Sequence, residues 1–122
     1  MLLARYVRQR SKRLFYGVLN SVRRKIEGYI QLAIDEGAKL VIDGWGRSLP
    51  GHEEGFFLWP TLIDYATPSM KSYQDEIFGP VLQIVRAETF EEALSYPNVH
   101  HQGNAVTVFT RTKVVTQRWP RG

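Results

Sequence analysis

The amino-acid sequence predicts an α/β fold in which a mostly parallel sheet is flanked by helices. Three observations support this: a long amphipathic run, several short runs of branched residues, and the alternation of these two patterns along the chain. The predicted order is helix, strand, strand, turn, strand, helix, strand, helix. A chain of 122 residues with 43% hydrophobic and 23% charged residues has the size and composition of one ordinary globular domain.

The first predicted helix begins at Ser21 and stops at Gly37. Its apolar residues recur at spacings of three and four, the period of one helix face: Val22, Ile26, Tyr29, Ile30, Ala33 and Ile34. A short strand is predicted at residues 39–42. An Asp-Gly turn then leads into a loop, residues 45–55, that is rich in glycine, proline and charge.

The next predicted strand covers residues 56–63 and contains Pro60. Proline cannot donate a backbone N–H to a neighbouring strand, so this strand should lie at a sheet edge or contain a bulge. A turn at residues 67–69 leads into one helical turn at Met70. Residues 81–85 are mostly apolar and branched, which is typical of a strand covered on both faces.

A further helix is predicted to begin after Thr89, its N-cap, and to end at Pro97. Three of its apolar residues are expected to face inward: Phe90, Ala93 and Leu94. After a polar loop, residues 105–110 are predicted to form a strand and residues 112–119 a last helix.

The net charge of +4 is unevenly distributed. Residues 1–25 hold eight Arg or Lys and no acid, while the rest holds eight bases and all twelve acids. Residues 1–16 are therefore interpreted as a basic N-terminal leader, either disordered or an amphipathic helix. It could contact an anionic membrane surface, a mitochondrial import receptor or nucleic acid, or have no partner. Nucleic acid is least favoured, because basic and aromatic residues do not interleave beyond the leader.

Several classes of site are excluded or disfavoured. The chain has no cysteine, which rules out disulfides, thiolate zinc sites and a cysteine nucleophile within it. No metal site is predicted, because the adjacent His100 and His101 do not converge on one ion, and no glycine-rich phosphate loop is present. Four acidic residues are interpreted as surface charges: Asp35, Glu36, Glu91 and Glu92.

The location of the protein is predicted from its hydropathy and its leader. No apolar run approaches the roughly 18–20 residues that cross a bilayer, so no transmembrane segment is predicted. We expect a cytoplasmic protein, or a mitochondrial matrix protein if the basic leader is an import signal.

Residues 76–81, Glu-Ile-Phe-Gly-Pro-Val, resemble the EIFGPV signature of the aldehyde dehydrogenase superfamily. Residues 55–62 and 67–70 resemble two further motifs of that superfamily, G-x-F-x-x-P-T-[LI] and T-P-x-M, in the same order. Within the superfamily, residues 25–41 and 79–86 are most similar to the CoA-acylating methylmalonate-semialdehyde dehydrogenases. The resemblance identifies residues 17–122 as a truncated, internal segment of an aldehyde dehydrogenase catalytic domain.

The resemblance implies an oxidoreductase in which a cysteine thiolate attacks the aldehyde, hydride passes to NAD and CoA accepts the acyl group. The implied substrates are malonate and methylmalonate semialdehyde, and the implied products are acetyl-CoA and propionyl-CoA. By matched position, Glu76 is implied to hydrogen-bond the nicotinamide-ribose hydroxyls and Phe78 to pack beside the nicotinamide.

These two roles agree with the chemistry of the side chains, since a carboxylate only accepts hydrogen bonds and an aromatic face suits a planar heterocycle. The residues alone leave other interpretations open. Asp75 and Glu76 could be a solvated surface pair, and Phe78 could be a core anchor.

The sequence also departs from the family. The catalytic cysteine, the general-base glutamate and most of the dinucleotide-binding domain are missing, so no catalytic residue is assigned and the isolated chain is predicted to be inactive, with weak or no binding of NAD. Trp59 replaces a usual glycine, and residues 102–105 replace a Y-G-N-G turn. The expected partner is the missing half of the enzyme. The alternative is a decayed gene product or non-catalytic interaction module that self-associates through an exposed face containing Phe56, Trp59 and Phe78.

Overall fold

The computed structural model describes residues 16–17, 20–103, 105–107 and 109. The chain divides into two compact units, Met1–Arg86 and Ala87–Gly122. The predicted helix at residues 112–119 and, apart from Tyr16, the basic leader lie outside the described residues.

Helix α2 (Asn20–Asp35) confirms the first predicted helix to within one residue at its start. Its buried face is formed by Ile26, Ile30 and Ala33. Gly37 ends the helix because it adopts a φ of 101°, which glycine accepts without a steric penalty. The N–H of Ala38 then donates to the carbonyl of Ala33 at 2.9 Å, one of the bonds of a Schellman ending.

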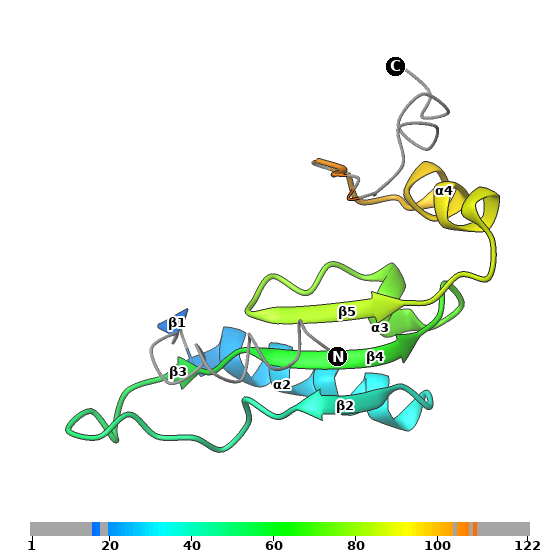
Figure 1. The fold of residues 1–122 in the computed structure, drawn as a ribbon. Helices are drawn as coiled ribbons and strands as arrows, with labels where there is room; N and C mark the ends of the chain where they lie inside the picture. The colour runs from blue at the N-terminus through cyan, green and yellow to red at the C-terminus, as the bar shows by residue number, and fades with distance from the viewer. Residues whose placement is uncertain (1–15, 18–19, 104, 108, 110–122) are drawn as a thin grey trace. The chain divides into compact units, whose positions relative to one another are not determined.

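Two small sheets follow from the strands of the first unit (Figure 1). The larger has the order β2 (Lys39–Ile42), β4 (Thr61–Ala66) and β5 (Val81–Val85). The β2 and β4 strands pair antiparallel, while β4 and β5 pair parallel. A second, two-stranded antiparallel sheet joins β1 (Tyr16–Gly17) to β3 (Phe57–Leu58). The predicted α/β class is confirmed, but the sheet is mixed rather than mostly parallel.

The predicted strand at residues 56–63 is in fact two strands, β3 and β4, in different sheets. Strand β4 is the central strand of its sheet, so of the two predicted alternatives the edge position is wrong, while a register shift does occur between Ile63 and Ala66. The reason is that Pro60 lies just before β4 and its missing N–H is not needed for pairing. The N–H of Thr61 begins the pairing with β5 by donating to the carbonyl of Pro80 at 2.9 Å.

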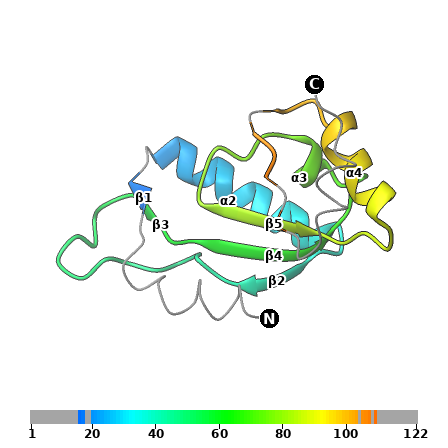
Figure 2. The same ribbon diagram turned by 45° about the horizontal axis from the view of Figure 1, so that its top comes forward.

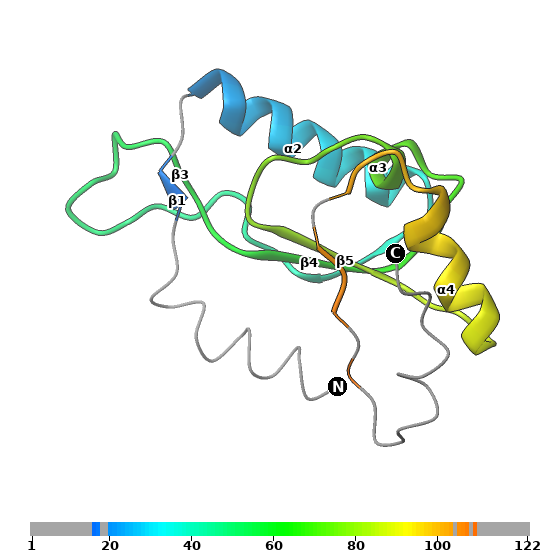
Figure 3. The same ribbon diagram turned by 90° about the horizontal axis from the view of Figure 1, so that it is seen from above.

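Helix α2 and the short helix α3 (Lys71–Gln74) lie on the same side of the larger sheet (Figures 2 and 3). One core cluster joins these helices to the sheet: Ala33, Ala38, Ile63, Ala66 and Met70. A second cluster lies under the N-terminal half of α2: Ile26, Ile30 and Leu58. Helix α3 confirms the helical turn predicted at Met70.

Strand β5 was expected to be covered on both faces, and the structure contradicts this. It is the last strand in the order of its sheet, and Leu82 on it is 46% exposed. An apolar run of branched residues indicates a strand but does not say whether other elements cover both of its faces.

In the second unit, helix α4 (Phe90–Val99) begins as predicted after Thr89, whose hydroxyl accepts the N–H of Glu92 at 3.1 Å. Pro97 does not end the helix, because its missing N–H removes one bond while the N–H of His100 still closes the last turn on Tyr96 at 3.2 Å. No residue of α4 is buried, and Ala93, expected to face inward, is exposed.

The strand predicted at residues 105–110 is wrong for the part that the structure describes, residues 105–107 and 109, where no strand is formed. A strand exists only through hydrogen bonds to a neighbouring strand, which the local sequence cannot supply. Among the described residues, no helix combines the length and the apolar character that crossing a membrane requires.

Candidate functional site

The segment that joins α3 to β5, residues 75–80, carries both residues predicted to contact a cofactor. Exposure alternates along it: Asp75 and Ile77 are half-buried, whereas Glu76 is exposed and Phe78 is 73% exposed. An extended chain directs successive side chains to opposite sides. The segment therefore turns Glu76 and Phe78 outward while their neighbours hold it to the protein.

Two residues fix this segment against α2. Ile77 packs on the core cluster of Ile26, Ile30 and Leu58. Gly79 approaches the helix so closely that an added Cβ would lie 2.5 Å from Cδ1 of Ile26. The backbone is tightly turned here, since the N–H of Gly79 donates to the carbonyl of Ile77 at 2.8 Å. A Cβ at Gly79 would therefore force the buried side chain of Ile26 to shift.

Asp75 ties the start of the segment to α2 and α3. Its carboxylate accepts the Tyr29 hydroxyl at 3.0 Å and pairs with the Lys71 ammonium at 3.0 Å. Hydrogen bonds from Lys71 and then Tyr29 lower the pKa of Asp75. The hydrogen bond to Asp75 is also the main cause of the raised pKa of Tyr29. Asp75 is therefore a structural tether, and Glu76 is not its partner in a solvated pair.

Glu36 holds the other end of α3. Its carboxylate accepts the backbone N–H of Lys71 at 2.7 Å, the N–H of Ser72 at 3.1 Å and the Ser72 hydroxyl at 2.6 Å. The hydrogen bond from Ser72 is the main cause of the lowered pKa of Glu36. The prediction of a plain surface charge is wrong for Glu36, and no local signal could have found this contact across 35 residues.

Glu76 makes no hydrogen bond or ion pair within the part of the chain that the structure describes. Phe78 is not a core anchor, because most of its surface is exposed. Trp59, expected on the same exposed face, is half-buried, and its indole N–H is buried without an acceptor among the described residues. Glu76 and Phe78 thus form the outward-facing pair, and Trp59 is not part of their surface.

A bulge lies at the carboxyl end of β4, just beyond the segment for which Pro60 predicted an edge position or a bulge. Tyr65 adopts a φ of 61°, unusual for an aromatic residue, where the register of β4 and β5 shifts. Arg86 holds this bulge: it donates to both carboxylate oxygens of Asp64, at 3.0 and 2.6 Å, and its guanidinium lies 4.5 Å from the centre of the Tyr65 ring. The hydrogen bond from Arg86 lowers the pKa of Asp64. Both oxygens of the Asp64 carboxylate are therefore bound by Arg86, and the group is not available as a general acid or base.

Among the described residues, no group of three His, Asp or Glu side chains lies together in a way that could hold a metal ion. The Nδ1 atom of His100 accepts a hydrogen bond from the backbone N–H of Gln102 at 3.0 Å.

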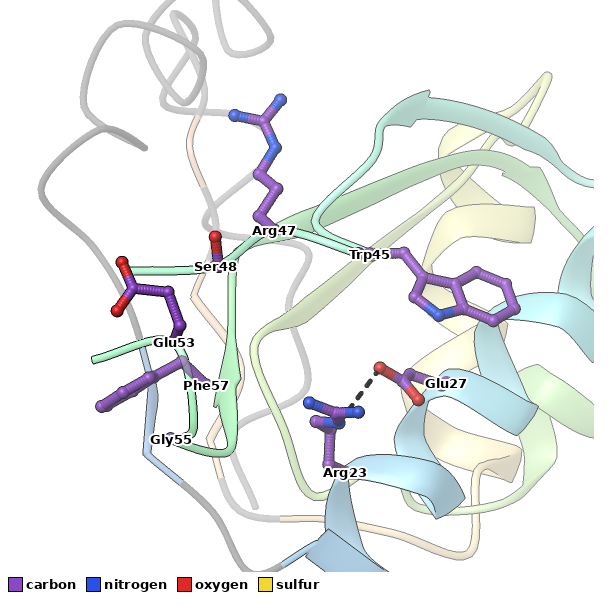
Figure 4. Close-up of a pocket in the computed structure, with 9 residues that line it drawn as sticks. Arg23, Glu27, Trp45, Arg47, Ser48, Glu53, Gly55 and Phe57 are labelled. Carbon is purple, nitrogen blue, oxygen red and sulfur yellow. Dashed lines mark ion pairs between the residues drawn. The ribbon is translucent and has the colours of Figure 1, made fainter. Parts of the chain in front are cut away.

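A cavity of about 290 Å³ has no residue of the 75–80 segment in its lining (Figure 4). Arg23 and Glu27 of α2 line it together with residues of the loop between β2 and β3. No local sequence pattern indicates this cavity, because the α2 residues and the loop residues that line it are about twenty residues apart in the chain.

Comparison with known proteins gives a consistent family. The model of the aldehyde dehydrogenase family matches residues 17–121. A malonate-semialdehyde dehydrogenase of Pseudomonas aeruginosa is 47% identical over 94 residues, which are 77% of this chain and 19% of that protein. A probable mitochondrial methylmalonate-semialdehyde/malonate-semialdehyde dehydrogenase (acylating) of Drosophila melanogaster is 41% identical over 97 residues, covering 80% of this chain and 19% of that protein.

Solved structures agree with these relatives. A Sinorhizobium meliloti protein described as a methylmalonate-semialdehyde dehydrogenase and complexed with NAD matches with a TM-score of 0.79 at 43% identity, over 84% of this chain and 21% of that one. Betaine aldehyde dehydrogenase of Staphylococcus aureus in complex with NAD+ matches with a TM-score of 0.74 at 34% identity, over 82% and 20%. The chain spans about a fifth of the length of the curated relatives it matches.

Proposed function

Because the chain belongs to the aldehyde dehydrogenase family, we propose that it supplies the nicotinamide-ribose contacts of an NAD site. The observation that supports this most directly is the outward pair of Glu76 and Phe78 on a segment anchored by Ile77 and Gly79. A carboxylate without an internal partner can accept hydrogen bonds from two ribose hydroxyls, and an exposed ring can lie against a planar nicotinamide.

The reaction proposed for the complete site is oxidation of malonate or methylmalonate semialdehyde, with NAD and CoA, to acetyl-CoA or propionyl-CoA. The names of the relatives from Pseudomonas aeruginosa and Drosophila melanogaster support this substrate class. NAD, when bound, is the hydride acceptor. In this chain, Glu76 would orient the ribose and Phe78 would exclude water from one side of the nicotinamide.

The catalytic thiolate must come from polypeptide outside these 122 residues, since the chain contains no cysteine. The expected affinity for NAD also requires further polypeptide. Two hydrogen bonds to a charged group contribute about 3–6 kcal/mol together, which at best gives a dissociation constant near 1 mM (about 4 kcal/mol) before the cost of association is counted. We therefore propose that the chain alone is inactive and binds NAD weakly or not at all.

Complementation tests the proposal. The chain would be co-expressed with a malonate-semialdehyde dehydrogenase from which the matching fifth has been removed, and NADH formation measured with malonate semialdehyde and CoA. We expect activity in the mixture and none from either part alone. Glu76→Gln should raise the KM for NAD by about 10- to 100-fold, because the amide keeps one acceptor oxygen instead of two and has no charge, which weakens cofactor binding.

Matched variants separate this effect from general damage. Glu54→Gln changes an exposed residue of the loop between β2 and β3 and should leave the KM for NAD unchanged, while Phe78→Ala should raise it. An assembled mixture that forms no NADH would refute the proposed function. Equal KM values in Glu76→Gln and Glu54→Gln would refute the role of Glu76.

A second candidate function is self-association. The exposure of Phe78 (73%) and Phe56 (44%) favours it, because large apolar side chains in contact with water promote association. Sedimentation velocity over a range of concentrations should then show a dimer that Phe78→Ser weakens. A monomer at every concentration would rule this function out.

We propose a cytoplasmic location for the protein. The mitochondrial relatives of Drosophila melanogaster and Arabidopsis thaliana support the matrix as the alternative. A fluorescent fusion with and without residues 1–16 distinguishes the two, since only an import signal would make the fusion follow the mitochondria.

A further inference from the structure

The short helix α3 is held to α2 at both of its ends. At the start of α3, Glu36 of α2 accepts the backbone N–H groups of Lys71 and Ser72, at 2.7 and 3.1 Å. At the end of α3, its C-cap Asp75 accepts the hydroxyl of Tyr29 of α2 at 3.0 Å. Tyr29 and Glu36 are about two helical turns apart and so lie on the same face of α2. Helix α3 is therefore clamped antiparallel along this face.

Helix α3 has few bonds of its own. It is four residues long, and the side chain of its N-cap Met70 makes no capping hydrogen bond. Its last turn is closed by the N–H of Gln74, which donates to the carbonyl of Met70 at 3.0 Å, and by the N–H of Asp75, which donates to that of Lys71 at 2.9 Å. A single helical turn is not stable in isolation. Contacts with other elements, those with α2 among them, therefore keep this turn in place.

Asp75 connects this last turn to the proposed cofactor contacts. Its backbone leaves the helix in an extended conformation, with φ −86° and ψ 146°. Successive side chains of an extended chain point to opposite sides, so holding Asp75 inward directs Glu76 outward. On the other side of Glu76, Ile77 packs on a core cluster. Glu76 thus lies between one polar anchor and one apolar anchor.

The polar anchor depends on Tyr29. The same oxygen of Asp75, Oδ2, receives the Tyr29 hydroxyl and the Lys71 ammonium, each at 3.0 Å. Lys71 belongs to α3 itself and its side chain is 67% exposed, so this ion pair neither joins α3 to α2 nor contributes much stability. Among the described residues, the Tyr29 hydroxyl is the group of α2 that binds the Asp75 carboxylate.

We propose that Tyr29 is a positioning residue for the NAD site, which sets the direction of Glu76 by holding Asp75. The inference rests on the proposed function, in which Glu76 meets the nicotinamide ribose. Tyr29 acts through Asp75 and does not contact the cofactor. Without its hydroxyl, a smaller fraction of molecules holds Glu76 in the binding position, and the apparent affinity for NAD falls by that fraction.

Tyr29→Phe tests the role in the complementation mixture, because it removes one oxygen and keeps the ring. The KM for NAD should rise about three- to tenfold, the effect of one hydrogen bond. The kcat and the KM for malonate semialdehyde should not change, since only the ribose contact is displaced. Tyr65→Phe, which removes the hydroxyl of an exposed tyrosine of β4, is the matched control and should leave all three constants unchanged.

A double-mutant cycle tests whether Tyr29 acts through Asp75. Asp75→Ala should raise the KM for NAD at least as much as Tyr29→Phe does. The double variant should have the same KM as Asp75→Ala, because the Tyr29 hydroxyl has then already lost its acceptor. A double variant whose KM shows the product of the two single effects would overturn the proposal.

Hydrogen exchange tests the clamp in the full chain alone, without NAD. In Tyr29→Phe the amides of Gln74 and Asp75, which close the last turn of α3, should exchange about threefold faster or more. The amide of Ala38, which closes the end of α2 on Ala33, should exchange as in the parent. Unchanged exchange at Gln74 and Asp75 would overturn the proposal whether or not the mixture is active.

The two proposals fail in different ways. If Glu76→Gln raises the KM for NAD in an active mixture but Tyr29→Phe does not, the role of Tyr29 is refuted and the proposed function stands. A parent mixture that forms no NADH refutes the proposed function and with it the role of Tyr29 toward NAD. Faster exchange at Gln74 and Asp75 would then still show that the Tyr29 hydroxyl holds this turn.

Discussion

Helices α2 and α4 both carry apolar residues at helical spacing, yet α2 buries three residues and α4 buries none. Helix α2 packs on β2 and β4, and its buried residues share clusters with Ile63 and Leu58 from the strands. Helix α4 has hydrogen bonds within its own turns, such as the Tyr96 hydroxyl to Glu92 at 2.6 Å. The same kind of pattern thus forms a helix in both units, but stability from burial depends on a partner surface.

The largest expected effect tests this difference directly. Ile63 is fully buried, so Ile63→Ala should lower the free energy of unfolding by about 2–5 kcal/mol, through lost burial and the cavity left behind. Val99→Ala in α4, where the side chain is 69% exposed, should change it by less than about 0.5 kcal/mol. Urea unfolding followed by circular dichroism measures both. Similar costs in the two variants would contradict the comparison.

A glycine in each unit gives the second test. Gly79→Ala should cost about 1–3 kcal/mol, because the new Cβ meets Ile26, itself buried in the core. Gly103→Ala in the second unit has open space around the added Cβ and should be nearly neutral. Thermal unfolding of the two variants distinguishes them. If Gly79→Ala were as stable as the parent, α2 would not be fixing the 75–80 segment.

The third test concerns the cap of α4. Thr89→Ala removes the acceptor for the Glu92 N–H and should destabilise this helix by about 1 kcal/mol, a large share for a helix without buried residues. NMR Cα shifts of residues 90–99 would report the loss of helix. Thr89→Ser keeps the acceptor and should preserve the shifts. Unchanged shifts in Thr89→Ala would show that α4 is held by more than its own turns.

The smallest expected effect is on the pH dependence of stability, and it arises from the Asp64–Arg86 pair of the first unit. The folded pKa of Asp64 lies below its unfolded value, chiefly through the hydrogen bond from Arg86. The stabilisation from this contact is therefore complete above the unfolded pKa and is lost as the pH falls through the folded pKa. Arg86→Gln should make the acid loss of stability shallower.

Urea midpoints measured between neutral and strongly acidic pH check this, and Arg24→Gln, at an exposed position of α2, is the control. A parent and an Arg86→Gln variant with parallel pH profiles would show that the pair does not contribute to acid stability.

The sequence predicted the local elements well, because they depend on neighbouring residues. The spacing of apolar residues and Gly37 placed both ends of α2 to within about one turn, and Thr89 placed the start of α4. Residues 39–42 form the predicted strand without change. In the 75–80 segment, the EIFGPV resemblance drew attention to Glu76 and Phe78, and the structure shows both side chains exposed; their roles toward NAD stay predictions.

Failures occurred where the outcome depends on distant residues. Pro60 suggested an edge, but β4 became central because β2 and β5 pair with it on either side. Residues 105–110 have a strand-like composition, yet their described part forms no strand. Pro97 shows that one missing N–H near a helix end is tolerated when a later bond closes the turn.

The sequence by itself therefore determined the family, both ends of α2 and the start of α4. Only the tertiary structure decided which strand is central, that Glu36 binds the start of α3, and that Gly79 lies against Ile26. The reason is physical. Helical bonds join residues four positions apart and are encoded in a short window, whereas strand pairing, capping and close packing join residues that only the folded chain brings together.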